Sequence, residues 1–407
     1  MINKSPNVYV FIDGLDEGED ELFCTPVQPM NLYDRKTPDV IIKNLFSGRI
    51  LSKAIKIVTS RPNSFLKLCP ECRPKFSVRI LGLSDKSRET FCRQLCGNNE
   101  TYLKVKEKRD ANPELRNLCH IPMYCKMITE LLKQKSAMDS THKVRLTSVF
   151  VQTFGRYFRE TNSQGGFGDL NALKALTKLA FEGVKRNTFT FEATDLSDLN
   201  KTTSSTFFRS EVDSQCSLKA ILLEGDKKFF FVHLLWQEFF AAVYLNFFTT
   251  DQEFDAVAAR LTENRWNTVT KFSFGFQNKD TNGKLKRIFP EFNTNISQTK
   301  LSTFKQLIST PLDIGNSRPQ FFWAFEADDV VFVQEAATLL PPEIVVTSSD
   351  PITTTSVLTY VLSNITTAKK QIWMERSIRP FKFHGEVFKM LMEVANSNGH
   401  KVSLYQD

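Results

Sequence analysis

The sequence has little of several features that would assign it to a class at once. Its 53 Lys and Arg residues against 45 Asp and Glu give a net charge of +8, yet no run of five or more basic residues occurs. A nucleic-acid groove needs clustered basic residues, so a nucleic-acid partner is disfavoured. No apolar leader precedes the first apolar strand, and the 8 cysteines show no secretory context. These features favour reduced thiols in a cytoplasmic protein.

A membrane span is also disfavoured. The one candidate stretch, from Phe229 to Phe248, carries His233, Gln237 and Glu238 near its middle. Each such residue at a bilayer centre would cost about a few kcal/mol. We therefore interpret this stretch as a buried element of a soluble fold.

Apolar residues, by contrast, are plentiful. Hydrophobic residues make up 41% of the chain, and 36 of its residues are Phe, which predicts well-packed cores rather than disorder. At 407 residues the chain is long for one domain and favours two to four.

The first strong signal is a strand followed by carboxylates, Val8-Tyr-Val-Phe-Ile-Asp-Gly-Leu-Asp-Glu17. Its first five residues are apolar without alternation, which predicts a strand buried on both faces of a parallel sheet. Ligands of open α/β sheets lie beyond the carboxyl ends of the strands. Asp13, directly after this strand, would therefore face the ligand and hold Mg²⁺ through water. Asp16 and Glu17 follow one short turn later, where a carboxylate could orient an attacking water. The stretch resembles the Walker B motif of NACHT proteins.

A crossover helix and a second strand are expected next. The triplet Thr37-Pro38-Asp39 is typical of a helix start, with an N-cap residue, a proline and an acid. The strand Ile55-Lys-Ile-Val-Thr-Ser-Arg-Pro62 then ends at Arg61, whose guanidinium could pair with a terminal phosphate. A plain surface charge is the alternative, although the run resembles the sensor-one Thr-Ser-Arg-Pro of NACHT proteins. A third strand is expected from Phe76 to Leu81.

Residues 84–140 are expected to be helical. One helix would be capped by Ser84 and stopped by Gly97, and a later one would be interrupted at Pro122. The run Leu118-Cys-His-Ile-Pro-Met resembles the segment of the family's first helical domain in which a proline packs on adenine. The resemblance gives Pro122 this role, and a simple helix break is the alternative.

Residues 141–248 predict two amphipathic helices, from Thr147 to Arg159 and from Leu170 to Val184, and then a β-hairpin that ends near Val232. The run Phe231-Val-His-Leu-Leu-Trp-Gln-Glu-Phe-Phe-Ala-Ala242 is similar to the winged-helix signature of NOD-like receptors. In that family the histidine contacts a diphosphate and locks the closed state. The resemblance gives His233 this latch role, with a satisfied structural histidine as the alternative.

Residues 249–350 resemble the family's second helical domain. Lys271-Phe-Ser-Phe-Gly-Phe276 and the nearby tryptophan fit its pattern, and Phe322-Trp-Ala-Phe-Glu-Ala-Asp begins a run similar to the one that leads into leucine-rich repeats. The stretch Ser356 to Ser363 with Lys370 to Trp373 could be a first repeat. No repeat period is sustained in the sequence, so we expect no sensor array here.

Taken in order, these motifs resemble the nucleotide-binding and oligomerisation core of a NACHT-domain NOD-like receptor, a STAND-class P-loop NTPase. The resemblance implies an α/β partial parallel sheet, the C-terminal half of a P-loop NTPase, followed by a helical domain, a winged helix and a second helical domain. The expected domains are 1–83, 84–140, 141–248, 249–350 and a helical transition toward leucine-rich repeats over 351–407.

The resemblance implies a function as a nucleotide-dependent oligomerisation switch in innate immune signalling. Nucleotide-binding roles fall to Asp13, Arg61, Pro122 and His233. ATP or ADP with Mg²⁺ would be the ligand, and further copies of the chain or related NOD-like receptors would be the partners.

The sequence has no G-x-x-x-x-G-K-[ST] loop to hold the phosphates, and Asn282-Gly283-Lys284-Leu285 is only a partial match. We therefore interpret the chain as a fragment without the Walker A half, and we do not expect it to hydrolyse ATP alone. The alternative is a non-catalytic scaffold or decoy that docks on full-length relatives. A nucleic-acid-binding winged helix is disfavoured because the wing contains only Lys227 and Lys228 as basic residues.

Four cysteines approach the spacing of a zinc site. Cys69 and Cys72 are followed by Cys92 and Cys96, but the second pair is C-x₃-C, and the pairs flank an expected strand rather than two knuckles. Free thiols are therefore the preferred interpretation.

Overall fold

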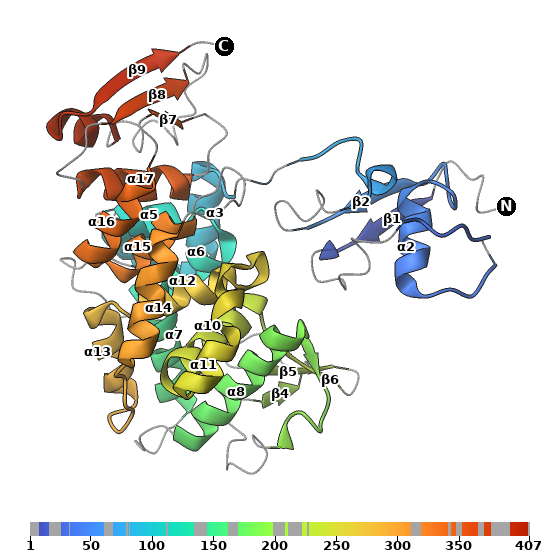
Figure 1. The fold of residues 1–407 in the computed structure, drawn as a ribbon, viewed down its shortest axis with the longest axis horizontal. Coiled ribbons are helices and arrows are strands. Elements are labelled where there is room, and N and C mark those ends of the chain that lie inside the picture. The colour runs from blue at the N-terminus through green and yellow to red at the C-terminus, as the bar shows by residue number, and fades with distance from the viewer. Residues whose placement is uncertain are drawn as a thin grey trace. The chain divides into compact units, whose positions relative to one another are not determined.

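The computed structural model divides the chain into two units, unit 1 over 1–80 and unit 2 over 81–407. It describes residues 8–15, 26–31, 33–60, 68–78, 80, 82–110, 113–133, 145–161, 170–197, 208–210, 222–225, 228–310, 319–340, 343–346, 352–364, 370–375 and 391–405. Figure 1 labels helices and strands of both units.

Unit 1 contains a parallel two-stranded sheet. Strand β1 (Tyr9–Ile12) pairs with β2 (Ile55–Val58) so that Ile12 lies opposite Val58, and both strands end at the same edge. Helix α2 (Pro38–Phe46) connects them, and the short 3₁₀ helix η4 (Pro70–Cys72) packs on α2. The expected crossover helix and second strand are therefore confirmed.

Two expectations for unit 1 are wrong. Strand β1 is not buried on both faces, because Tyr9 is 59% and Phe11 is 71% exposed. Within the described residues the sheet has two strands, and Ile55 and Ile57 are exposed on the same face. The strand expected from Phe76 to Leu81 is absent from the described positions 76–78 and 80, since apolar alternation cannot form a strand without a neighbour to pair with.

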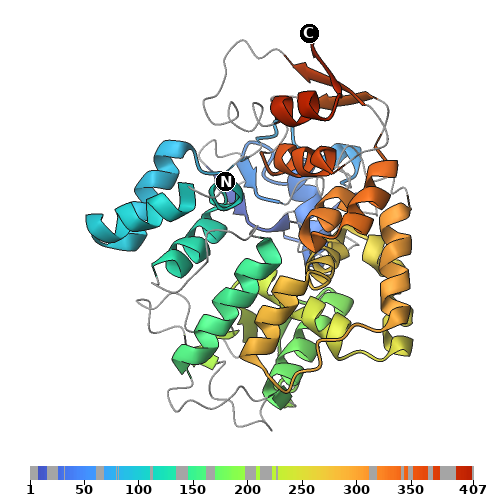
Figure 2. The same ribbon diagram turned by 90° about the vertical axis from the view of Figure 1, so that its left-hand side faces the viewer.

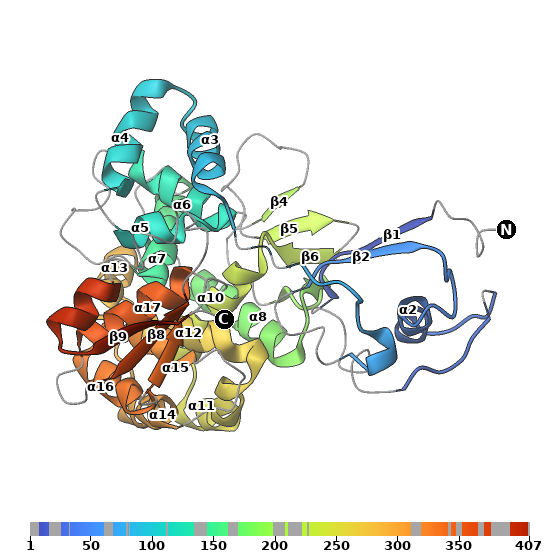
Figure 3. The same cartoon turned by 90° about the horizontal axis from the view of Figure 1, so that it is seen from above.

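Unit 2 begins with a group of helices, which lie together in Figure 3. They are α3 (Asp85–Cys96), α4 (Asn99–Asp110), α5 (Pro113–Leu118) and α6 (Pro122–Leu132). The expected start and stop of α3 are confirmed. The Ser84 hydroxyl accepts a hydrogen bond from the amide of Ser87, and Gly97 has a φ of +75°.

Two long helices and a small sheet follow. The helices are α7 (Leu146–Thr161) and α8 (Leu170–Arg186), close to their expected bounds. The sheet has the order β3 (Thr190–Phe191), β6 (Lys228–Phe231), β5 (Leu222–Gly225) and β4 (Phe208–Ser210). Strands β5 and β6 form an antiparallel pair, which confirms the expected hairpin.

Helix α10 (Leu234–Phe247) is the central helix of unit 2, since its residues from Trp236 to Asn246 are all buried. A helix that is apolar all round must be buried, as expected for this stretch. Its C-terminal end is capped by Lys300, whose ammonium donates to the carbonyls of Leu245, Asn246 and Thr249 at 2.8–3.1 Å. Among the described helices, none is long and apolar enough to cross a bilayer.

More helices follow α10 in the chain. They are α11 (Asp251–Ala258), α12 (Asn267–Gly275), α13 (Lys279–Ile288), α14 (Gln298–Ser309), α15 (Pro319–Ala327) and α16 (Val330–Thr338), with 3₁₀ turns η5 (Ala259–Thr262) and η6 (Asn264–Trp266). Of these, α12 packs directly on α10.

The C-terminal part of unit 2 contains a parallel sheet that the sequence did not predict. Strands β7 (Glu343–Val346), β8 (Gln371–Glu375) and β9 (Lys401–Tyr405) pair in order. Helix α17 (Ile352–Ser363) follows β7, and a short helix over 391–397 precedes β9 (Figure 2). Successive strands begin 28 and 30 residues apart, and this near-constant spacing is typical of a strand–helix repeat.

Candidate functional site

The end of β1 is joined to the end of β2 by hydrogen bonds of Thr59. The Thr59 hydroxyl donates to the Asp13 carboxylate and accepts from the amide of Gly14 at 3.0 Å. The Thr59 backbone donates to the carbonyl of Ile12 at 2.9 Å and accepts from the amide of Leu15 at 2.9 Å. Gly14 has a φ of +69°, which permits this tight turn.

This arrangement places oxygen donors at the carboxyl edge of a parallel pair. The carboxylate of Asp13 and the hydroxyl of Thr59 are ligands of the type that Mg²⁺ prefers, directly or through water. The donor set therefore fits the cation expected at Asp13. Sequence reasoning gave Thr59 no role, although its place directly after a strand that pairs with β1 was a usable signal.

Three of the expected site residues, Asp16, Glu17 and Arg61, lie outside the described residues. The strands that lead to them are described, and their parallel register brings the chain ends after Ile12 and Val58 to one edge. The roles of these residues remain predictions.

Pro122 is the first residue of α6. Ile121 before it is extended, with a φ of −90° and a ψ of 123°, as a residue that precedes proline should be. The chain entering unit 2 lies against this turn. The amide of Leu83 donates to the carbonyl of His120 at 2.6 Å, and a Cβ on Gly82 would lie 2.5 Å from that same oxygen. Gly82 therefore allows the close approach that holds the backbone just before Pro122.

His233 is exposed and forms the N-cap of α10. Its Nδ1 accepts a hydrogen bond from the amide of Leu235 at 3.1 Å. A nitrogen that accepts carries no proton, so in the neutral ring the proton is on Nε2, which is a donor. His233 thus has the structural role that was the alternative interpretation. The same hydrogen bond favours the tautomer in which Nε2–H could donate to an anionic oxygen.

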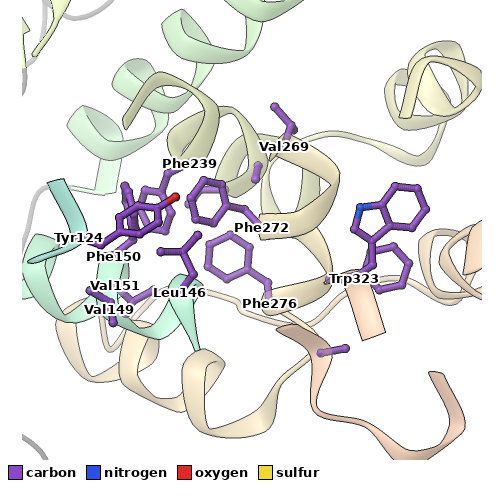
Figure 4. Close-up of a cluster of buried hydrophobic side chains, with 14 of the residues drawn as sticks. Tyr124, Leu146, Val149, Phe150, Val151, Phe239, Val269, Phe272, Phe276 and Trp323 are labelled. Atoms are coloured by element: carbon purple, nitrogen blue, oxygen red, sulfur yellow. The ribbon is translucent and has the colours of Figure 1, made fainter. Parts of the chain in front are cut away.

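One aromatic side chain connects the two helices that carry Pro122 and His233. Phe150 of α7 is fully buried, and its ring centroid lies 6.4 Å from Tyr124 of α6 and 4.8 Å from Trp236 of α10. Figure 4 shows Phe150 beside Tyr124 within the aromatic cluster of unit 2. The structure therefore links the first turns of α6 and α10, whereas Asp13 belongs to unit 1.

The cysteines of α3 and α6 form a buried thiol contact. The sulfur atoms of Cys92 and Cys125 lie 3.3 Å apart, and both residues are fully buried. Their mutual hydrogen bond, together with burial, raises the pKa of the Cys92 thiol. Among the described residues, no group of three or more His, Cys, Asp or Glu side chains is arranged to hold a metal ion.

Comparison with known proteins finds relatives whose names include NACHT or nucleotide-binding oligomerization domains. The chain is 26% identical over 257 residues to NACHT, LRR and PYD domains-containing protein 3 of Bos taurus, across 60% of this chain and 24% of the relative. It is 25% identical over 274 residues to nucleotide-binding oligomerization domain-containing protein 1 of Homo sapiens, across 60% of this chain and 27% of the relative. The chain is a homologue of the NACHT-domain NOD-like receptors.

This NOD-like receptor homologue spans about a quarter of the length of those two relatives. A search against protein-family models finds no match. Sequence reasoning assigned no role to three residues of this chain, Thr59, Gly82 and Phe150. Each acts through a contact with a residue distant in sequence, which local patterns do not reveal.

Proposed function

We propose that this chain is the core of a nucleotide-dependent oligomerisation switch in an innate immune receptor of the NOD-like type. The observation that carries the proposal is the hydrogen-bonded edge formed by Asp13, Gly14 and Thr59 at the ends of two parallel strands. The similarity to NACHT proteins supports the same function.

The proposed domains follow the family order. Residues 1–83 would be the C-terminal half of the nucleotide-binding domain, 84–140 the first helical domain, 141–248 the winged-helix domain and 249–350 the second helical domain. The hairpin of β5 and β6 directly before α10 supports the winged-helix assignment.

In the proposed mechanism, Asp13 would hold Mg²⁺ through water, and the ion would neutralise charge on the phosphates. Arg61 would contact the third phosphate, and Asp16 and Glu17 would orient the attacking water. With ADP bound, Pro122 and His233 would hold their helices on the nucleotide. Exchange for ATP favours an open, oligomerising form, to the extent that the two nucleotides differ in affinity for the two forms.

A second candidate function is a scaffold that docks on related receptors without binding nucleotide. The lack of a G-x-x-x-x-G-K-[ST] loop in this sequence favours it. The two functions differ in one measurable respect, which is binding of ATP or ADP by the chain itself.

The substitution Asp13→Asn should weaken Mg²⁺-dependent ATP binding by about ten- to a hundredfold, because it removes the negative charge that faces the cation. Isothermal titration calorimetry of the whole chain with ATP, with and without Mg²⁺, measures the effect. Asp34→Asn is a matched control in unit 1, since the Asp34 carboxylate caps a local turn by accepting from the amide of Asn31 at 2.9 Å. Equal affinities for the wild type and Asp13→Asn would remove Asp13 from the site, and no binding to the wild type would favour the scaffold.

The substitution His233→Ala should increase assembly in the presence of ADP, because the proposed latch on the closed form is lost. Static light scattering of the whole chain with ADP measures the fraction of oligomer. Alanine also removes the N-cap of α10, which typically costs about 1 kcal/mol.

His233→Asn separates these two roles, since asparagine is a good N-cap but lacks the imidazole Nε2–H. If the latch is correct, both variants assemble more than the wild type. If only the alanine variant does so, the effect comes from the weakened helix start and the latch role of His233 is wrong.

A further inference from the structure

Helix α17 connects the C-terminal sheet to the rest of unit 2. It lies between that sheet and the helices α15 and α16 in both Figure 1 and Figure 2. It packs on α15 and α16 and also on α5. Helix α17 lies between β7 and β8 in the chain, and the side chain of Asn398, just before β9, donates to the carbonyl of Leu362 in α17 at 2.8 Å.

A polar bridge of three residues, Arg145, Asp328 and Tyr360, joins α17 to the start of α7. The Tyr360 hydroxyl donates to the Asp328 carboxylate, and the Arg145 guanidinium donates to the same oxygen at 2.7 Å. Arg145 is 1% exposed, and its guanidinium carbon lies 4.0 Å from the ring centroid of Phe325 and 4.9 Å from that of Tyr360. Burial and the bond to Asp328 raise the pKa of Tyr360, so its hydroxyl remains a donor.

The turn that carries Asp328 also carries the carboxylate that holds α7. Glu326 accepts hydrogen bonds from the amides of Leu146 and Thr147 at 3.2 and 3.0 Å, and from the Thr147 hydroxyl at 2.8 Å. Asp328 itself has a φ of +49°, a conformation that is uncommon outside glycine and needs support from its surroundings. The polar bridge supplies this support.

Helix α7 continues the contacts toward the proposed site. Phe150, one turn after Leu146, contacts Tyr124 and Trp236 in the helices of Pro122 and His233. Direct contacts therefore run from α17 through the polar bridge and α7 to both of these helices.

We propose that the polar bridge is a regulatory coupling element, through which the position of the C-terminal sheet sets how firmly the first turn of α7 is held. A change at the sheet that moves α17 would loosen this turn and, through Phe150, the helices of Pro122 and His233. The effect on nucleotide binding rests on the proposed function, whereas the coupling between α17 and α7 does not. Coupling of this kind is reciprocal and can be measured.

The substitution Tyr360→Phe tests the coupling, because it removes one hydroxyl and keeps the ring. Hydrogen–deuterium exchange of the whole chain should become about 3- to 10-fold faster for the amides at the start of α7, as expected for loss of one hydrogen bond. Ser363→Ala in the same helix is the control. The Ser363 hydroxyl donates to the carbonyl of Tyr360 at 2.7 Å and accepts from the Asn364 side chain at 3.1 Å, and the loss of these local bonds should leave exchange in α7 unchanged.

A double variant adds a second criterion. If Tyr360 and Arg145 act through the shared Asp328 carboxylate, Tyr360→Phe with Arg145→Lys should raise exchange by less than the product of the two single effects. Unchanged exchange in α7, or an equal rise throughout unit 2, would overturn the coupling. Faster exchange in α7 without any nucleotide binding would support the coupling and contradict the proposed function.

Discussion

Gly275→Ala should lower the free energy of unfolding of unit 2 by about 2 to 3 kcal/mol, the cost of overpacking a tight core. A Cβ at this position, the last residue of α12, would lie 1.9 Å from the hydroxyl oxygen of Thr147 and 2.5 Å from its Cβ. Thr147 cannot give way easily, because its amide and hydroxyl are both bonded to the buried Glu326. The Phe-Gly pattern of the sequence thus has a packing reason, since only glycine lets α12 approach α7 this closely.

Tryptophan fluorescence during urea unfolding measures this change. All 4 tryptophans of the chain, Trp236, Trp266, Trp323 and Trp373, belong to unit 2, so the signal reports on that unit. Gly283→Ala in α13 is the matched control, because a Cβ there meets no atom within 4 Å. Alanine in an exposed helix is favoured over glycine by up to about 1 kcal/mol, so this variant should be as stable as the wild type or more stable. Similar stability of the two variants would contradict the close packing of α12 on α7.

Glu326→Ala should destabilise unit 2 by about 3 to 5 kcal/mol, the usual cost of removing one partner from a buried charged group. Glu326 is 1% exposed and accepts from two amides and one hydroxyl at the start of α7, and its carboxylate lies 4.0 Å from the ammonium of Lys271. Alanine would leave these donors without their acceptor and would remove the negative charge that favours a helix N-terminus.

Two further variants show whether the charge or the position matters. Glu326→Gln keeps the volume and one acceptor oxygen, so it should cost less, about 1 to 2 kcal/mol. Glu335→Ala is a matched change in α16 at a half-buried residue, whose carboxylate accepts from the Ser309 hydroxyl at 3.0 Å, and it should stay within about 0.5 kcal/mol of the wild type. The prediction is contradicted if Glu326→Ala and Glu335→Ala unfold at the same urea concentration, because Glu326 would then not anchor α7.

Local signals in the sequence were sufficient for several helix ends. The cap at Ser84, the stop at Gly97 and the proline at the start of α6 depend on neighbouring residues alone, and the structure confirms each of them. The hairpin before α10 was predicted for the same reason, because its two strands are separated by a short turn.

Contacts between distant residues were not predictable in this way. The bond between Glu326 and Thr147 joins residues 179 positions apart, and the bond between Thr59 and Asp13 joins residues 46 apart. The strand expected from Phe76 to Leu81 failed for a related reason, since an apolar alternation predicts a strand only if a partner is present to pair with it. The parallel strands β7, β8 and β9 were missed because pairing partners 28 and 30 residues apart do not share a local pattern.

The central claim is that the nucleotide decides between a closed and an assembling form. The most direct test is the mass of the whole chain by size-exclusion chromatography with light scattering, in Mg²⁺ with ADP and in Mg²⁺ with a non-hydrolysable ATP analogue. The account predicts a smaller species with ADP and a larger one with the analogue. The same mass with both nucleotides, at concentrations where calorimetry shows that they bind, would contradict it.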